Sequence, residues 1–271
     1  AQVTRLPLRA EHGYLPDLAA LEAAVTADTK LIALTNPNNP TGAVATPDLN
    51  VFMVLELRAL AALCARIDRP YSHWVDEADA LRERIDALLW DASIGAYGAI
   101  GFKHGARQIE DERVRSVGPG EGDALESWVG LLPLLLDAPA ERAERMLADL
   151  RDPDGYMSEV GPRTVPKRSP YFSQAPRVLL YDHQRGRRGP VSNWQGPVWM
   201  LSSYYLWEAS RAAGDHALAR EISKRSLRLI ERAWDVDGRF FECWDDEGRG
   251  LWPPEGTFAS FNLLALTMAR S

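Results

Sequence analysis

The chain has 271 residues, of which 46% are hydrophobic and 25% charged, the composition of an ordinary soluble globular protein. Its net charge of −7 implies no basic surface, so we expect no nucleic acid partner. The longest uncharged apolar run, residues 129–136, is too short to cross a bilayer, so no membrane partner is expected. The two cysteines, Cys64 and Cys243, lie far apart and form no metal-binding cluster, so a reduced, cytoplasmic protein without a metal is expected. No secretory signal is visible, and the chain begins at Ala1 rather than Met, which is consistent with a fragment of a longer protein.

The first 46 residues differ in composition from the rest of the chain, because all nine Trp residues lie at or beyond Trp74. Their pattern predicts a strand near residues 3–8, a helix over Leu18–Val25 and a buried strand over residues 31–34. The second strand leads into residues 36–42, NPNNPTG, a turn in which prolines fix φ and asparagines bond locally. We therefore expect a short α/β appendage over residues 1–46.

This appendage resembles a known family in residues 13–18 (GYLPDL) and 36–42. Over about residues 3–45 it is similar to the pyridoxal-phosphate aminotransferases of fold type I. The resemblance implies that Asn39 would hydrogen-bond the phenolic oxygen of the cofactor. That chemistry also needs a lysine for the Schiff base, and none of the four lysines stands in the Ser-x-x-Lys setting of the family. Lys103 is the best remaining candidate for the Schiff-base lysine. Because the lysine setting of the family is missing, we expect no cofactor, and pyridoxal phosphate is the alternative.

From about residue 47 onward, apolar residues recur at helical spacing and few strands are expected. The pattern is typical of stacked helical hairpins whose connecting loops carry the function. The predicted helices span Val51–Ile67, His73–Leu89, Ala124–Leu136, Ala140–Leu150, Val198–Ala213, Ala217–Trp234 and Phe258–Ala269.

Three helices are followed by an acidic turn with a glycine and then an aromatic residue, at residues 90–97, 152–156 and 234–240. The fourth residue after the glycine is Ala99, Glu159 or Glu242. Glu242 lies between Phe241 and Cys243, where a charge is costly unless it is paired or functional. Glu159 has a more solvent-facing context. A salt-bridged loop acid is the alternative for both.

Residues 192–199, SNWQGPVW, place two indoles around an amide side chain and a rigid Gly-Pro corner. Trp faces beside a fixed amide suit a sugar, which has apolar C–H surface and hydroxyl groups. The alternative is that Trp194 and Trp199 are core anchors at a helix start.

An ordered set of motifs gives the stronger resemblance: residues 48–50 (DLN), 88–97, 192–199, 241–248 and 258–261. Over about residues 47–271 the chain resembles the catalytic domain of glycoside hydrolase family 63 and its bacterial glucosylglycerate and mannosylglycerate hydrolase relatives. The resemblance implies a mainly α fold, an (α/α)6 toroid of six helical hairpins. Since only seven helices are predicted after residue 47, we expect an incomplete toroid whose exposed edge favours self-association.

The resemblance also implies roles for individual residues. Glu242 matches the general base. It would activate water to hydrolyse an α-glucoside or α-mannoside such as glucosylglycerate, with inversion of configuration at the anomeric carbon. The family often has Arg where this chain has Gln195. The substrate-binding residues expected are Asn193, Trp194, Gln195, Trp199, Trp244 and Phe258.

Inverting cleavage needs a second carboxyl group to protonate the leaving oxygen, roughly 6.5–9.5 Å from the first. In the family that Asp lies on a Trp- and Pro-rich loop upstream of the DLN stretch, where this chain has its aminotransferase-like segment. We therefore expect that two fragments are joined near residues 46–50 and that the hydrolase part lacks its general acid. Without this acid it should lose most of its hydrolysis rate, and Glu159 is the remaining candidate for the second carboxylate. A non-catalytic carbohydrate-binding toroid is a third interpretation.

Overall fold

The computed structural model describes residues 18–26, 46–98, 126–169, 172–174, 194, 196–253 and 255–270. Helices dominate these residues, and none of those helices combines the length and apolar character that a bilayer crossing requires. The predictions that lie outside the described residues are the strands near 3–8 and 31–34 and the residues Asn39, Lys103, Asn193 and Gln195.

The described helices confirm the predicted mainly α fold. The α-helices are α1 (Leu18–Ala24), α2 (Pro47–Arg66), α3 (Ser72–Leu88), α4 (Ala140–Arg151), α5 (Met200–Ala212), α6 (His216–Arg232) and α7 (Leu264–Met268). Two short 3-10 helices, η2 (Trp128–Leu136) and η4 (Phe261–Leu263), and one π-helical turn, η3 (Ala233–Asp237), accompany them.

The strands are short and form three small antiparallel sheets. Two are hairpins, β1 (Trp90–Asp91) with β2 (Ala96–Tyr97) and β3 (Met157–Ser158) with β4 (Gly161–Pro162). The third has the order β5 (Val198–Trp199), β6 (Cys243–Trp244) and β7 (Gly250–Trp252).

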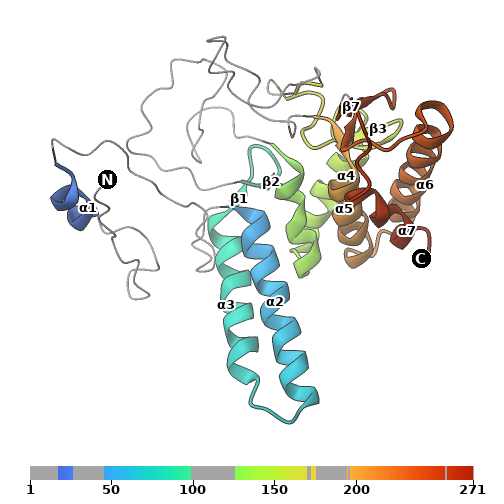
Figure 1. Cartoon of the computed structure of the whole chain (residues 1–271). Coiled ribbons are helices and arrows are strands. Elements are labelled where there is room, and N and C mark those ends of the chain that lie inside the picture. The colour runs from blue at the N-terminus through green and yellow to red at the C-terminus, as the bar shows by residue number, and fades with distance from the viewer. Residues whose placement is uncertain are drawn as a thin grey trace.

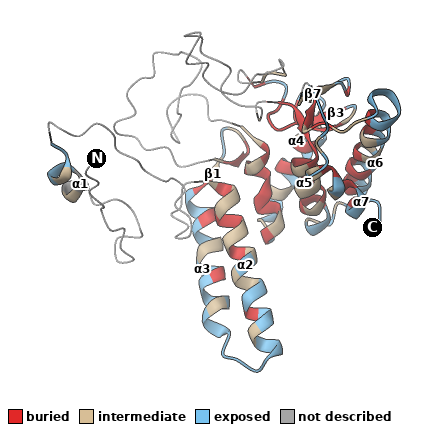
Figure 2. Ribbon diagram, in the orientation of Figure 1, coloured by how far each residue is buried: buried red, intermediate tan, exposed pale blue. Residues whose placement is uncertain are grey.

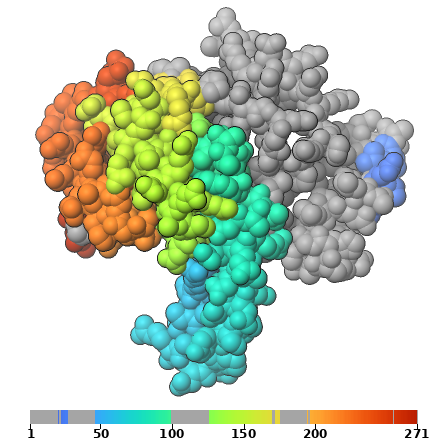
Figure 3. Space-filling model, turned by 180° about the vertical axis from the view of Figure 1, so that it is seen from behind, coloured from blue at the N-terminus to red at the C-terminus, as the bar shows by residue number. Residues whose placement is uncertain are grey.

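The helices form two layers. In one layer α2 packs on η2, η2 on α5, and α5 on α7. In the other layer α3 covers α2, α4 contacts η2, and α6 covers α5 and α7. This pairing of an inner with an outer helix is that of an (α/α)6 toroid, of which the described helices are a part. The α2–α3 hairpin projects from the remaining helices (Figures 1 and 3).

The main core lies where these layers meet, around side chains such as Leu131, Leu132, Leu150 and Leu206, each with no exposed surface. A second, smaller cluster of Val198, Leu229, Ala233, Phe241 and Trp244 lies under the β5–β6–β7 sheet. Figure 2 shows burial concentrated in η2, α5 and the sheet, and exposure at the tip of the α2–α3 hairpin. The buried side of the molecule therefore includes the sheet that carries the motif residues.

Four predicted helix starts were wrong. The helix predicted from Val51 begins at Pro47, since proline is well tolerated at the first position of a helix. The segment predicted as a helix over Ala124–Leu136 is, where described, a 3-10 helix from Trp128, since Pro133 inside it cannot donate an α-helical hydrogen bond. The helix predicted from Val198 begins at Met200, because the two preceding residues pair with β6. The helix predicted from Phe258 begins near Phe261, and the preceding backbone is held by the bond from the Phe258 N–H to the carbonyl of Phe240.

The close packing of η2 against β2 gives a stability prediction. A Cβ atom at Gly130 would overlap the backbone carbonyl oxygen of Tyr97, which cannot move aside as a side chain could. We expect Gly130→Ala to lower the free energy of unfolding by about 1–3 kcal/mol, as overpacking does. Gly98→Ala is the control, because its Cβ would meet nothing within 4 Å. Equal urea midpoints for the two variants would contradict this packing.

Candidate active site

The β5–β6–β7 sheet brings together two motifs that are far apart in the sequence. Val198 pairs with Trp244 and Trp199 with Cys243, so the strand that follows Trp194 lies beside the strand that follows Glu242. On the far side of β6, Cys243 pairs with Trp252 of β7. Backbone pairing therefore places the strand that follows Glu242 next to the strand that follows the predicted sugar-binding loop.

The backbone around Glu242 is held from two directions. Its N–H donates to the carbonyl oxygen of Trp252 at 2.6 Å. The buried side chain of Asn262 donates from Nδ2 to the carbonyl oxygens of Phe241, at 2.8 Å, and Phe258, at 2.5 Å. The segment that leads to Glu242 is thus fixed both to β7 and to the start of η4.

The side chain of Glu242 is half-buried, and no described residue gives it an ion pair or a side-chain hydrogen bond. Burial raises the pKa of its carboxyl group, because removal from water disfavours the charged form. A partly buried, unpaired carboxyl group with a raised pKa is suited to take a proton from water. The adjacent Cys243 is not a nucleophile candidate, since burial and the neighbouring Glu242 raise the pKa of its thiol to about 12.

A continuous row of aromatic rings leads to this sheet. The Trp194 ring stacks on Trp199 with centroids 3.7 Å apart and an interplanar angle of 14°. Trp128 also stacks near Trp194, with ring centroids 5.9 Å apart, and Tyr205 stacks on Trp128 at 6.3 Å. Phe52 of α2 ends the row, 5.0 Å from Tyr205. Trp194 is partly exposed and Trp199 only 3%, so Trp194 is the more accessible of the two rings.

The other predicted site residues differ in position. Glu159 is exposed, on the turn between β3 and β4, a hairpin that adjoins β5 through the pairing of Arg163 with Val198. Trp244 has no exposed surface, so its ring packs in the small core beneath the sheet. Phe258 is half-buried and packs on Phe261 with centroids 5.6 Å apart. Among the predicted site residues, the structure therefore stacks Trp194 on Trp199 and pairs the strand of Trp199 with the strand that follows Glu242.

Sequence reasoning missed a buried polar bridge that supports this arrangement. The guanidinium of Arg163, 3% exposed, contacts both carboxylate oxygens of Asp246 and donates from Nη1 to three backbone carbonyls. Gln174 donates to Asp246 at 2.8 Å and to the carbonyl of Gly196 at 3.2 Å. The bridge thus joins the turn after β6 to the loop that carries Trp194. Nothing in the sequence marked it, because its members are scattered along the chain.

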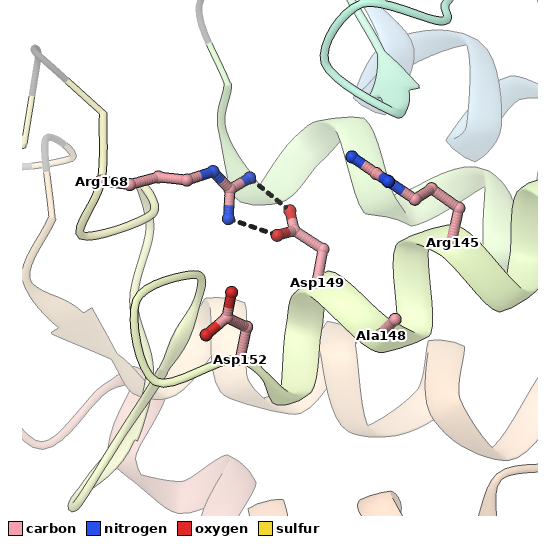
Figure 4. A pocket seen from close by; sticks show the side chains of 5 residues that line it. All are labelled: Arg145, Ala148, Asp149, Asp152 and Arg168. Carbon is pink, nitrogen blue, oxygen red and sulfur yellow. Dashed lines mark hydrogen bonds and ion pairs between the residues drawn. The ribbon is translucent and has the colours of Figure 1, made fainter.

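A hollow beside α4 is distinct from this site. It is lined by Arg145, Ala148, Asp149, Asp152 and Arg168 (Figure 4). Arg168 forms ion pairs with Asp149 and with Glu126, and the hydrogen bond to Asp149 raises its pKa further. The charges that it offers are thus largely neutralised within the protein. The described residues also include no group of three His, Cys, Asp or Glu side chains that could hold a metal ion.

Two solved structures share the fold of this chain. Mannosylglycerate hydrolase of Thermus thermophilus, in complex with glucose, aligns with a TM-score of 0.58 and 22% identity over 82% of this chain and 46% of that chain. Neutral trehalase Nth1 of Saccharomyces cerevisiae aligns with a TM-score of 0.58 and 19% identity over 84% of this chain and 38% of that one. The fold is therefore that of the toroidal glycoside hydrolases, and the chain spans less than half the length of these two proteins.

A family model narrows the class. The model of the mannosylglycerate hydrolase MGH1-like glycoside hydrolase domain matches residues 19–253, so the chain belongs to that family. This confirms the family resemblance, although the match over residues 19–253 both begins and ends earlier than the predicted 47–271.

Shorter matches connect the chain to aminotransferases. Transaminase BacF of Bacillus subtilis (strain 168) is 51% identical over 45 residues, which are 17% of this chain and 11% of the transaminase. An aromatic amino acid aminotransferase of Mycobacteroides abscessus is 34% identical over 128 residues, 44% of this chain and 34% of that protein. The chain therefore covers only part of each aminotransferase.

The raised pKa of Glu242 gives a prediction with a definite sign. A carboxyl group with a higher pKa in the folded than in the unfolded state binds more protons when folded, so stability falls as pH rises through that range. We expect Glu242→Gln, which removes the charge, to be more stable than the wild type at pH 7. This difference should shrink once the pH falls below the ordinary Glu range.

Urea unfolding at pH 7 and pH 4 measures the effect. Glu159→Gln, which removes a carboxylate from an exposed turn, is the matched control and should change stability by less than about 0.5 kcal/mol. A Glu242→Gln variant that is less stable than the wild type at pH 7 would show that the carboxylate has a stabilising partner.

Proposed function

We propose that this chain is an inverting glycoside hydrolase domain that acts on an α-glucoside or α-mannoside such as glucosylglycerate, with Glu242 as the general base. The observation that carries the proposal is the pairing of β5 with β6, which puts the strand next to Glu242, an unpaired and half-buried acid, beside the strand that follows two stacked indoles. Membership of the MGH1-like glycoside hydrolase family supports the reaction type. The complex of the Thermus enzyme with glucose supports a sugar of this class.

In the proposed reaction Glu242 removes a proton from a water molecule while the water oxygen attacks the anomeric carbon. The bond from that carbon to the leaving oxygen breaks, and the configuration inverts. The solvent-accessible part of the Trp194 ring would contact the apolar C–H surface of the sugar, and the stacked Trp199 would hold that ring in place. Asn193 and Gln195 would bond hydroxyl groups, while Phe258 would border the site and buried Trp244 would support it from below.

The leaving oxygen needs a proton, and the second carboxylate proposed for it is Glu159 on the β3–β4 turn. Glu159 is exposed, so it lacks the burial that makes a good acid at neutral pH. We therefore propose that this chain alone turns over natural glycosides slowly, since acid assistance contributes about 10²–10⁴-fold. A substrate whose leaving group needs no proton should escape this limit.

That difference gives a direct test with two substrates. Fluoride leaves as an anion, so α-D-glucosyl fluoride should be hydrolysed by a site with a base alone, above its spontaneous rate. Glucosylglycerate should be hydrolysed far more slowly. We expect Glu242→Gln to lower kcat on the fluoride by at least about 100-fold with KM nearly unchanged, because the base acts in the transition state.

Glu159→Gln is the control and should leave fluoride hydrolysis unchanged. Fluoride hydrolysis that survives Glu242→Gln would refute the assignment of the base. Equally fast turnover of glucosylglycerate and the fluoride would show that the chain has an efficient general acid, which contradicts the proposal. Sugar binding without hydrolysis of either substrate would instead support a carbohydrate-binding toroid.

Pyridoxal-phosphate transamination is the second candidate, favoured by the 51% identity to a transaminase over 45 residues. It goes with our proposed division of the chain into an aminotransferase-like segment, 1–46, and a glycosidase-like domain, 47–271. Borohydride reduction of the chain mixed with pyridoxal phosphate distinguishes the two functions. Transamination requires a stoichiometric reduced adduct on one lysine, whereas the hydrolase proposal predicts none.

A further inference from the structure

The start of α2 holds buried oxygen atoms that no protein group satisfies. Thr46 Oγ1, Asp48 Oδ1 and Asn50 Oδ1 are all enclosed without a hydrogen-bond partner among the described residues. Asn50 has no exposed surface, and its Nδ2 donates to the Thr46 carbonyl at 2.6 Å, so its amide lies against the first turn of the helix. Each unmet buried polar atom costs about 1–3 kcal/mol, so three in one turn call for an explanation.

The concentration is specific to this turn. The remaining unpaired buried polar side-chain atoms of the described residues lie singly on separate segments, in Tyr156, Ser203, Ser226, Trp244 and Asn262. The residues at the start of α2 also belong to the DLN motif. A cluster of this kind is typical of a place where a ligand supplies the missing donors.

The aromatic row connects this turn to the candidate active site. Asp48 and Phe52 are four residues apart on α2 and therefore share a face of the helix. Phe52 contacts Tyr205, from which the stacked rings continue through Trp128 to Trp194.

Hydrogen bonds place the starts of the neighbouring helices at the same end. The Trp128 N–H, at the start of η2, donates to the Thr164 carbonyl at 2.9 Å. The Gly196 N–H, in the loop before α5, donates to Thr164 Oγ1 at 3.0 Å. Thr164 thus holds the start of η2, on which α2 packs, together with the loop that carries Trp194.

We infer that the first turn of α2 forms a hydroxyl-binding subsite of the sugar site through Asp48, which lies on the helix face of Phe52, an inference that rests on the proposed function. The unpaired atoms Asp48 Oδ1 and Asn50 Oδ1 are hydrogen-bond acceptors, and sugar hydroxyl groups are donors that fit them. An anionic ligand would be repelled by the Asp48 carboxylate. The Thr46 hydroxyl can both donate and accept, so it completes a site for a polyhydroxylated ligand.

Tryptophan fluorescence titration with D-glucose and D-mannose tests the subsite without requiring turnover. We expect Asp48→Ala to weaken binding of the preferred sugar by about 10- to 100-fold, the loss typical of a hydrogen bond to a charged group. Asp48→Asn retains an oxygen acceptor and should weaken it less. Asp76→Ala, which removes an exposed carboxylate from α3, is the matched control and should bind as the wild type does.

Monodeoxy sugars separate a direct contact from a structural role. One deoxy analogue should bind the wild type as weakly as the parent sugar binds Asp48→Ala, and should lose nothing further in that variant. A uniform loss for every analogue, with a lowered melting temperature, would mean that Asp48 only stabilises the helix and would overturn the inference. Unchanged binding in Asp48→Ala would also overturn it but leave the proposed function standing. Failure of the wild type to bind either sugar would overturn both.

Discussion

Two residue pairs of antiparallel backbone, Val198 with Trp244 and Trp199 with Cys243, are the constraint on which the candidate site depends. Without them the indole loop and Glu242 would belong to unconnected segments. The pairing also ends the helical pattern before Met200, so that α5 begins with its first turn against the sheet. Strand pairing in a mainly helical protein here serves to position side chains rather than to build a large sheet.

Some buried polar groups of the described residues are fully hydrogen-bonded, whereas others have no partner. The buried guanidinium of Arg163 is satisfied by Asp246 and backbone carbonyls, and Gln174 extends the bridge to Gly196. Such a satisfied network fixes the geometry of a turn, whereas removing one partner would leave a costly buried charge. Glu242 and Asp48, by contrast, retain buried oxygen or carboxyl groups without partners among the described residues. Buried polar groups without a partner in the protein are those for which a role in binding or catalysis is expected.

The sequence predicted the helices because their apolar spacing is local, and it singled out Glu242 because a charge among Phe241, Cys243 and Trp244 conflicts with burial. It predicted helix starts poorly at Trp128, Val198 and Phe258, since strand pairing and an internal proline override the periodic pattern. The bridge from Arg163 through Asp246 to Gln174 could not be predicted, because it joins residues that only the tertiary fold brings together. The DLN motif was recognised as a match, but its unpaired oxygens became visible only in the fold.

The central claim is that Glu242 directs water to the anomeric carbon from the side opposite to the leaving group. The stereochemistry of the first product tests this most directly, because mutarotation is slower than an enzymatic burst at high protein concentration. Proton NMR of α-D-glucosyl fluoride hydrolysis by the wild type should show β-D-glucose forming first, and no such excess in Glu242→Gln. Initial formation of α-D-glucose would contradict an inverting mechanism and the role assigned to Glu242.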